Sequence, residues 1–498
     1  MSLFGLDGQL IEVETDISSN LPAFNLVGLP DAALNESAAR VRAATTNSKL
    51  SLPGRKITVN LSPASVPKHG SAFDLAIAMS ALAAASLVSK SQVSDVLFLG
   101  ELALDGRIKP TVGILPAVMA AKKHGFRKVV IPSANLREAS LIGQMELQAF
   151  DHLTQVAFHF GANVTPLESI AQVMSIESQT KAPPCFSEVI GQDDAVQALK
   201  IAAVGAHHLL MVGPPGAGKT MLAQRLPGIV PELSEEEAVE VAAIRSLARL
   251  PYLSGSATVP FQAPHNTATL AAMVGGGSAI PRPGLISLSH NGVLFLDEVP
   301  EFRSSVLESL RQPLESGTIT INRAAGQAKF PARFQLVLAA NPCPCGNSIG
   351  TGKNCVCTPS MKNKYMGKIS GPLSDRLDLR MELNSVNAST ALGSGSITET
   401  SAEIATQVRI ARQRTKNRLA NTPWQLNSQV PGTYLRNQLR LKESVTKQLD
   451  LSLNRGLVSM RGYDRILRLA WSVADLAGSK IPTQEDLALA MFYRGFES

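Results

Sequence analysis

The stretch that decides the fold is HHLLMVGPPGAGKTMLAQRL, residues 207–226. A short apolar run leads into the pattern G-x-x-x-x-G-K-T, and a helical pattern follows it. Glycines at this spacing let backbone N–H groups wrap a phosphate, Lys219 can reach the β and γ oxygens, and the Thr220 hydroxyl can bind Mg²⁺. We therefore predict that ATP and Mg²⁺ bind at Gly213, Pro214, Pro215, Gly216, Ala217, Gly218, Lys219, Thr220 and Met221.

Two further apolar runs supply the remaining groups for hydrolysis. GVLFLDE, residues 292–298, ends in adjacent carboxylates, so Asp297 would hold Mg²⁺ and Glu298 would polarise the attacking water. FQLVLAAN, residues 334–341, places Asn341 at the carboxyl end of a strand, where parallel sheets keep their ligand sites. Asn341 could then orient water near the γ-phosphate, or it could be an ordinary turn residue before a proline.

Length and composition limit the class of protein. A chain of 498 residues buries two or three separate cores. The start of the chain lacks a basic segment followed by an apolar run, and the most apolar run, residues 75–88, is too short to cross a bilayer. We expect a soluble, cytoplasmic protein of a reducing compartment with no membrane partner.

The charge is unevenly distributed. The whole chain carries a formal charge of +7, whereas residues 401–470 hold 13 Lys and Arg against 4 Asp and Glu, a surplus of 9. The basic character therefore lies at the C-terminal end, and it favours a polyanionic partner.

Composition shifts divide the chain into five segments. We predict an α/β domain over residues 1–170, a linker over 171–187, a second α/β domain over 188–386, a linker over 387–402 and helices over 403–498. In the helical part, one apolar face is marked by Ile404, Val408, Ala411 and Leu419, and the side chains expected to point elsewhere are Arg409, Arg412 and Lys416.

Through these motifs the chain resembles the ComM/YifB family of magnesium-chelatase-like AAA+ ATPases over nearly its whole length. The resemblance rests on FSEVIGQDDAVQALKIAAVGAHHLLMVGPPGAGKTML, PHNTATLAAMVGGG, GLISLSHNGVLFLDEVPEF, LRQPLESGTITINRA, ANPCPCG and ISGPLSDRLDL. It implies a bacterial hexameric DNA motor that drives branch migration during natural transformation. The implied partners are single-stranded and branched DNA, further copies of the chain and recombination proteins.

The resemblance also assigns residues. Arg376, in GPLSDRL, resembles the arginine finger that reaches a neighbouring subunit's site, which implies a ring. Arg461, in SMRGYDRILRLA, resembles the sensor arginine that the helical lid carries on its own subunit.

Two insertions resemble the pore-facing parts of such motors. Residues 318–341 read as a hairpin with its turn at 324–327, where Arg323 and Lys329 could meet DNA phosphates or be ordinary charges at a solvated tip. PHNTATLAAMVGGGSAIPRPG, residues 264–284, is expected to form a mobile loop at the same face.

The first domain resembles the Lon protease domain, whose fold is related to ribosomal protein S5. The predicted fold is thus an AAA+ P-loop core between an α+β Lon-like domain and a C-terminal helical lid. Lon-type proteolysis needs a serine activated by a lysine. Here Leu115 stands at the lysine position and Ala72 at the nucleophile position, although Ser71 is adjacent. We expect a scaffold that forms the ring or contacts DNA, not a protease.

Four of the five cysteines form two Cys-x-Cys pairs: Cys343, Cys345, Cys355 and Cys357. They could complete a tetrahedral Zn²⁺ site, stay as reduced structural thiols or form a regulatory disulfide. A metal here would fix the Asn341 segment relative to the Arg376 segment. Cys185 lies in the first linker and is expected to be inert.

Three classes of function therefore compete. A DNA branch-migration motor fits the basic C-terminal segment. A metal-chelatase motor shares the ATPase core but leaves the Lon-like domain unexplained. A protein-remodelling factor would want aromatic pore loops, and the sequence from Thr318 to Lys329 contains no aromatic residue.

Overall fold

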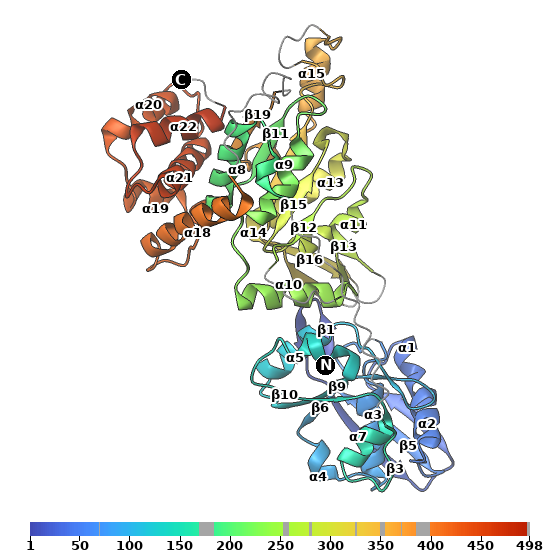
Figure 1. The fold of residues 1–498 in the computed structure, drawn as a ribbon. Helices are drawn as coiled ribbons and strands as arrows, with labels where there is room; N and C mark the ends of the chain where they lie inside the picture. Colours follow the sequence, from blue (N-terminus) through green and yellow to red (C-terminus); the bar gives the residue numbers. More distant parts are fainter. Residues whose placement is uncertain are drawn as a thin grey trace.

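The computed structural model describes residues 1–68, 70–168, 184–251, 258–277, 281–323, 326–348, 354–369, 371–384 and 399–495. Three parts follow one another along the chain (Figure 1). The N-terminal α/β part lies at one end, the part containing the phosphate loop is central, and the C-terminal helices pack beside it. Most of the two predicted linkers falls outside the described residues, so the domain limits stay predictions.

The central part is built on one parallel sheet of five strands in the order β12-β15-β18-β11-β19. Its strands are β12 (Phe261–Gln262), β15 (Val293–Leu296), β18 (Gln335–Ala340), β11 (Leu209–Val212) and β19 (Leu379–Glu382). The strands β11, β15 and β18 are buried along their whole length, as expected of a parallel sheet covered by helices on both faces. Their carboxyl ends meet at one edge, which confirms the predicted α/β core.

The helices of the core alternate with these strands along the chain, beginning with α8 before β11. They are α8 (Asp193–Gly205), α9 (Lys219–Arg225), α10 (Glu235–Leu247), α12 (Leu285–Leu288), α13 (Ser304–Ser309), α14 (Arg311–Ser316), α15 (Pro359–Met366) and α16 (Gly371–Ser374). The helix α10 begins with a capping box, in which the side chains of Ser234 and Glu237 each accept a hydrogen bond from the other's backbone N–H group.

The N-terminal part contains two three-stranded sheets. One has the order β3-β5-β4, with β3 (Glu12–Ser18), β5 (Lys56–Ser62) and β4 (Ala23–Val27). The other has the order β10-β9-β6, with β10 (Glu146–Phe150), β9 (Lys128–Pro132) and β6 (Val96–Phe98). The main covering helices are α2 (Ser37–Asn47), α3 (Asp74–Ala84), α5 (Ile114–Lys123) and α7 (Leu153–His159).

The N-terminal part packs against the core at α10 and at the hairpin of β16 (Thr318–Arg323) and β17 (Gly326–Pro331). The helix α5 packs against α10, so that Ala242 and Ala243 complete an apolar cluster with Leu115 and Val118. The hairpin of β1 (Ser2–Phe4) and β2 (Asp7–Gln9) reaches the core as well, because Gly5 forms a β-bridge with Lys329. In Figure 1, β1 and α5 lie at the end of the N-terminal part that faces α10.

The C-terminal lid consists of α18 (Ser401–Arg418), α19 (Gly432–Asn437), α20 (Glu443–Asn454), α21 (Met460–Ala477) and α22 (Gln484–Tyr493). The predicted apolar face of α18 is confirmed: Ile404, Val408, Ala411 and Leu419 are all buried. The prediction that Arg412 points away from the packed face was wrong. Its guanidinium donates to the carbonyl of Ala203 in the last turn of α8, where helical carbonyls lack partners within the helix. Burial lowers the pKa of Arg412 to about 10.

The first of the two insertions forms the predicted hairpin. The predicted hairpin is present as β16 (Thr318–Arg323) and β17 (Gly326–Pro331), paired antiparallel with Arg323 opposite Gly326. Residues 324 and 325 of its predicted turn lie outside the described residues, and Gln327 already belongs to β17.

The expectation of a mobile loop over 264–284 was wrong for the part that the structure describes. Thr269 caps α11 (Leu270–Val274), and β13 (Gly275–Gly276) pairs with β14 (Arg282–Pro283). A Cβ on Gly284 would lie 2.3 Å from the backbone nitrogen of Gly275, so the glycines of this segment allow two chain segments to touch instead of serving flexibility.

Among the described residues, no helix is both long and apolar enough to cross a bilayer.

Candidate nucleotide-hydrolysis site

The phosphate loop joins the end of β11 to the start of α9. Gly216 and Gly218 have φ of +78° and +86°, the left-handed region that favours glycine, and the position of a Cβ on Gly216 is open space. The Lys219 ammonium donates to the carbonyls of Gly213 (2.7 Å) and Pro214 (2.9 Å). The loop thus has the open backbone cradle and the adjacent cation that a polyphosphate requires.

Asn341 contacts the same lysine. The Lys219 Nζ atom lies 3.1 Å from Asn341 Oδ1, so the end of β18 faces the phosphate loop. Burial lowers the pKa of Lys219, and the negative charges of Asp297 and Glu298 oppose that shift. The structure therefore brings together residues 219, 297, 298 and 341, which the sequence places as many as 122 positions apart.

The carboxylates follow β15. The Thr220 hydroxyl donates to Asp297 Oδ2 over 2.5 Å, so the two predicted Mg²⁺-binding side chains are adjacent. A hydroxyl and a carboxylate are oxygen donors of the kind that Mg²⁺ prefers, and this pair fits the ion. Glu298 is exposed, with φ of +50°, and the side-chain amide of Asn266 donates to its Oε2 atom over 3.2 Å.

Three side chains at this site were not found from the sequence. Asn266 holds Glu298, although it lies 32 residues earlier. Gln192 is buried and donates to the carbonyls of Ala217 and Asn384, which ties the phosphate loop to the segment after β19. Tyr365 of α15 is buried near Glu301 and Glu298; burial and then these negative charges raise the pKa of Tyr365 to about 12. Gln192 could have been found from the sequence, because it lies in GQDD, residues 191–194, within one of the blocks that carry the family resemblance.

The two predicted arginines lie together. Arg376 follows α16, where it forms an ion pair with Glu315 and donates to the carbonyl of Pro372. Burial lowers the pKa of Arg376, and the nearby positive charge of Arg461 adds to the shift, followed by those of Arg311 and Arg465. Arg461 is exposed in the first turn of α21. The contacts of Arg376 are thus with α14, α16 and the lid arginines.

A buried polar network anchors the lid beside Arg376. Arg465 of α21 pairs with Asp378, and the backbone N–H of His208 donates to Asp378 Oδ2 over 3.2 Å. Burial would raise the pKa of Asp378, but the hydrogen bond with His207 and the charge of Arg465 outweigh it and hold the pKa well below its usual range. Burial lowers the pKa of His208 to about 4, so that ring stays neutral.

The family described as magnesium chelatase, subunit ChlI, matches residues 185–391, and two related descriptions match the flanks. Subunit ChlI of Mg-chelatase matches residues 13–135, and the ChlI C-terminal family matches residues 398–494. The Competence protein ComM of Haemophilus influenzae is 40% identical over 98% of this chain and 95% of its own. The protein YifB of Escherichia coli is 38% identical over 99% of this chain and 96% of its own.

The chain belongs to the ComM/YifB family of magnesium-chelatase-like AAA+ proteins. An uncharacterized protein of Mycobacterium tuberculosis is 45% identical over 98% of this chain and 96% of its own. A shorter match, 30% identical over 30% of this chain and 28% of the other, is to Lon protease 2 of Bacillus subtilis. This family membership, together with the assembled site, indicates ATP hydrolysis as the chemistry of the core.

In this ComM/YifB-family chain the predicted DNA-contacting residues lie on the β16–β17 hairpin. The Arg323 guanidinium lies beside Gly276, so the hairpin and the β13–β14 insertion meet on one side of the core. Lys329 lies further back on the hairpin, and its backbone contacts Gly5 of the N-terminal part. Of the two, Arg323 is thus closer to the turn of the hairpin.

Much of the basic charge in the lid is used internally. Six of the 13 basic residues of segment 401–470 donate to protein oxygens: Arg412, Arg414, Arg418, Arg436, Arg465 and Arg468. Arg418 pairs with buried Asp475 and covers the ring of Trp471. The charge count alone therefore overstates the basic surface that the lid offers to a polyanion.

In the Lon-like part, the residues at or next to the positions of the Lon catalytic pair have structural contacts. Leu115 is fully buried at the start of α5. The Ser71 hydroxyl donates to the carboxylate of Glu101, which Lys109 also contacts at 3.5 Å. Leucine cannot accept a proton, so Leu115 cannot activate a nucleophile as a lysine does.

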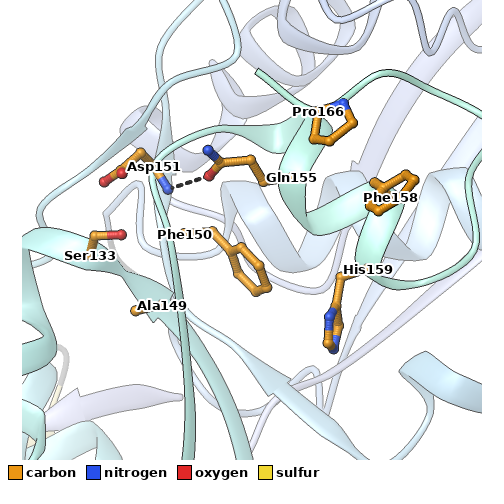
Figure 2. A pocket seen from close by; sticks show the side chains of 8 residues that line it. All are labelled: Ser133, Ala149, Phe150, Asp151, Gln155, Phe158, His159 and Pro166. Carbon is orange, nitrogen blue, oxygen red and sulfur yellow. Dashed lines mark hydrogen bonds between the residues drawn. The ribbon is translucent and has the colours of Figure 1, made fainter. Parts of the chain in front are cut away.

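A hollow of about 530 Å³ lies elsewhere in this part, between β10 and α7. Its lining is mixed, with Phe150 and Phe158 beside the polar side chains of Asp151, Gln155 and His159 (Figure 2). None of the nucleotide-site residues lines it.

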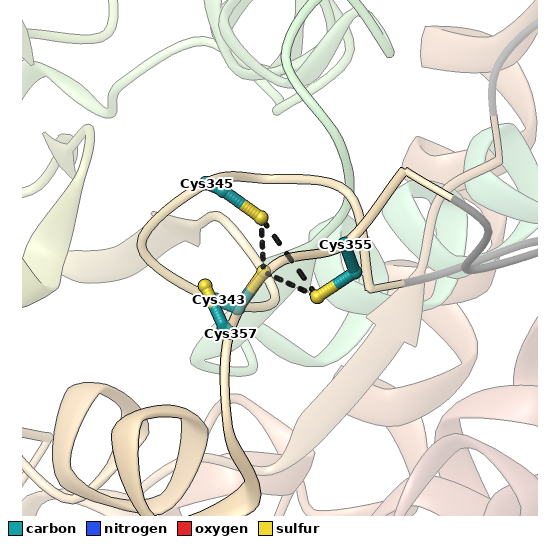
Figure 3. A group of neighbouring side chains, drawn as sticks. All are labelled: Cys343, Cys345, Cys355 and Cys357. Atoms are coloured by element: carbon teal, nitrogen blue, oxygen red, sulfur yellow. Dashed lines mark hydrogen bonds between the residues drawn. The ribbon is translucent and has the colours of Figure 1, made fainter.

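The four clustered cysteines lie at the end of β18 and before α15. Their ligand atoms all lie within 4.8 Å of one another, and none of the five cysteines in the chain forms a disulfide. The sulfurs of the first pair and Cys355 converge on one point, and the Cys357 sulfur lies beside them (Figure 3). The Cys185 sulfur lies apart, where it accepts a hydrogen bond from the backbone of Ser401.

Proposed function

We propose that this protein is an ATP-driven hexameric DNA motor that promotes branch migration of recombination intermediates. The observation that carries the proposal is the arrangement of the catalytic groups: the phosphate loop, the carboxylates and Asn341 meet at one sheet edge, while Arg376 pairs with Glu315 and lies near Arg461. The full-length likeness to a protein named Competence protein ComM supports DNA as the substrate class.

The roles follow from the geometry. The loop from Gly213 to Gly218 binds the phosphates, and Lys219 reaches their oxygens once it exchanges its present carbonyl partners for them. Thr220 and Asp297 hold Mg²⁺, which supplies charge neutralisation at the phosphates. Glu298 accepts a proton from the attacking water, Asn266 keeps the carboxylate in place until then, and Asn341 orients the water.

The arginines complete the site of a neighbour. Arg376 contacts Glu315 and lies close to the lid arginines, so it serves a second subunit, as a finger acting in trans does. Because Arg461 lies beside Arg376, we assign it to the same neighbouring site instead of the site on its own subunit. Two cations from one subunit then face the phosphates of the next, an arrangement that a closed hexameric ring repeats at every interface.

The DNA contact is assigned to the β16–β17 hairpin. Arg323 projects near its turn beside the glycine-rich insertion, and Lys329 lies on the adjacent strand. Both would meet backbone phosphates, which are recognised by charge and not by sequence. The exposed basic residues of the lid, such as Arg409 and Lys416, add a second, weaker surface.

A chelatase-type or protein-remodelling ATPase is the second candidate. The matching families are described by a magnesium chelatase subunit, and they cover the N-terminal part as well as the core and the lid. Such a motor would share the ATPase site and act on a protein client.

The deciding experiment measures ATP hydrolysis and strand exchange on a synthetic four-way DNA junction. We expect junction resolution that depends on ATP and is abolished in Lys219→Ala. Arg323→Ala with Lys329→Ala is expected to lose strand exchange while it keeps basal hydrolysis. Hydrolysis that is indifferent to every DNA tested would contradict the DNA motor and favour the protein client.

A further inference from the structure

In the segment that carries the four cysteines, the described residues 343–348 and 354–357 include a single large aliphatic side chain, Val356. Val356, between Cys355 and Cys357, is 84% exposed, while Cys343 is fully buried and the sulfurs face one another. A loop that turns its only large aliphatic side chain among residues 343–348 and 354–357 to water needs another source of order. Metal binding supplies that order in segments too small to bury apolar surface.

The spacing of the sulfurs matches a tetrahedral thiolate site. Zinc–sulfur bonds of about 2.3 Å place the corners of a tetrahedron about 3.8 Å apart. The Cys343 sulfur lies 3.4 Å from that of Cys345 and 3.8 Å from that of Cys355, and the Cys345 and Cys355 sulfurs are also 3.8 Å apart. Four thiols without a metal form only weak hydrogen bonds, so the convergence of all four indicates a shared ligand.

The same loop touches the phosphate loop. Gly346 has φ of +80°, and a Cβ on it would lie 2.5 Å from Pro215 Cδ. The loop starts two residues after Asn341, which contacts Lys219, and it ends at Thr358, which caps α15. Through Tyr365, α15 reaches the neighbourhood of Glu298. Both ends of the cysteine segment are thus attached to the hydrolysis site.

We propose that Cys343, Cys345, Cys355 and Cys357 bind one Zn²⁺ ion as thiolates and that this ion fixes the Gly346–Pro215 contact against the phosphate loop. Soft thiolates in a tetrahedral set select zinc over the harder Mg²⁺ of the nucleotide site. The thiols release their protons on binding, so the site fills more completely as the pH rises. The coupling to hydrolysis rests on the proposed ATPase function, whereas the metal site does not.

The first test is the metal content of the full-length protein, purified without a metal-affinity step and measured by mass spectrometry. We expect about one zinc per chain. Cys185→Ser is the matched control and should keep the ion, whereas Cys345→Ser with Cys357→Ser should lose it. Wild-type protein that contains no zinc and takes up none under reducing conditions would overturn the proposal, whether its cysteines are free thiols or a disulfide.

Cobalt exchange tests the ligand set independently of variant folding. Co²⁺ in the wild-type protein should give the intense visible and thiolate charge-transfer absorption of tetrahedral sulfur coordination. Weak absorption of an octahedral oxygen site, or none, would contradict four-thiolate binding.

The coupling is tested by Gly346→Ala. The added Cβ and the positive φ should displace the loop from Pro215, so we expect unchanged zinc content and a fall in kcat of about tenfold or more, as small misplacements of catalytic groups produce. Unchanged kcat would overturn the coupling and leave the metal site standing. If zinc-loaded wild-type protein hydrolyses no ATP, the proposed function fails, and the metal measurement still decides the site.

Discussion

The edge of the central sheet and the Lon-like part differ in how their polar side chains are used. At the sheet edge, Lys219, Asn341, Thr220 and Asp297 form a connected set of hydrogen bonds around an open glycine loop. In the Lon-like part, Ser71 is bonded to a carboxylate and the lysine position is a buried leucine. The contrast shows that a serine adjacent to a catalytic position carries little information unless its activating base is also present.

The largest expected effect tests whether the working site is completed by a neighbour. Arg376→Ala should lower kcat by about 10³-fold, the usual contribution of an arginine finger. Mixing it with Glu298→Gln should restore part of the activity, because some interfaces then combine an intact carboxylate with an intact arginine. Glu315→Gln removes only the internal ion pair and should stay active. Mixed rings no more active than the separate variants would place Arg376 in its own site.

The next largest effect concerns Glu298, the proposed general base of the hydrolysis site. The Lon-like part has no such base, because Leu115 stands at the position of the lysine. Glu298→Gln should lower hydrolysis by about 10²- to 10³-fold, since the amide cannot accept the proton. ATP binding, followed with a fluorescent analogue, should be retained. Steady turnover in this variant would remove Glu298 from the mechanism. Asn266→Ala should have a smaller effect, since it frees the carboxylate without removing it.

Acid should lower the stability of the contact between the lid and the central sheet, where His208 and Asp378 lie. His208 has a pKa of about 4 when folded, below its ordinary value of about 6.5, so the unfolded chain binds more protons between these values. The free energy of unfolding therefore falls as the pH is lowered from about 6.5 to 4. The depressed pKa of Asp378 adds a further loss below its ordinary value of about 4, since protonation then favours the unfolded chain.

Tryptophan fluorescence measures this loss selectively. Both tryptophans of the chain, Trp424 and Trp471, belong to the lid. We expect the lid transition in urea to move to lower urea concentration as the pH falls, with a shallower dependence below pH 4 in Asp378→Asn. A lid transition independent of pH between 4 and 6.5 would contradict the assignment of a neutral, buried His208.

The last prediction is that a change at Ser71 has no measurable effect on activity. Ser71→Ala should change neither ATP hydrolysis nor the absence of peptidase activity, because Leu115 cannot activate the hydroxyl. A fluorogenic casein assay on both proteins checks this. Peptidase activity that Ser71→Ala removes would show that another base serves the serine.

Residue patterns predicted the motif residues of the nucleotide site better than the side chains that contact them from distant segments. The phosphate loop, Asp297 and the strand before Asn341 were accessible because an apolar run followed by a glycine or carboxylate signature is read locally. Asn266 and Tyr365 were not, since their contacts with the Glu298 region depend on which strands pair and on where α15 packs. Arg412 shows the same limit: helical periodicity gives the face of a residue but not the free carbonyl that a long side chain can reach.

The apolar contact between α5 and α10 bears on why a domain without a catalytic lysine persists. Ala242 and Ala243 on the ATPase side share their burial with Leu115, which stands where the Lon pattern has its lysine. Deleting the N-terminal part would expose that apolar surface to water, and a lysine at position 115 would place a charge in the contact between α5 and α10. Such a lysine would thus destabilise the contact between the two parts, and truncation would leave the apolar surface of α10 uncovered, so the ATPase part depends structurally on a domain that lacks the catalytic pair.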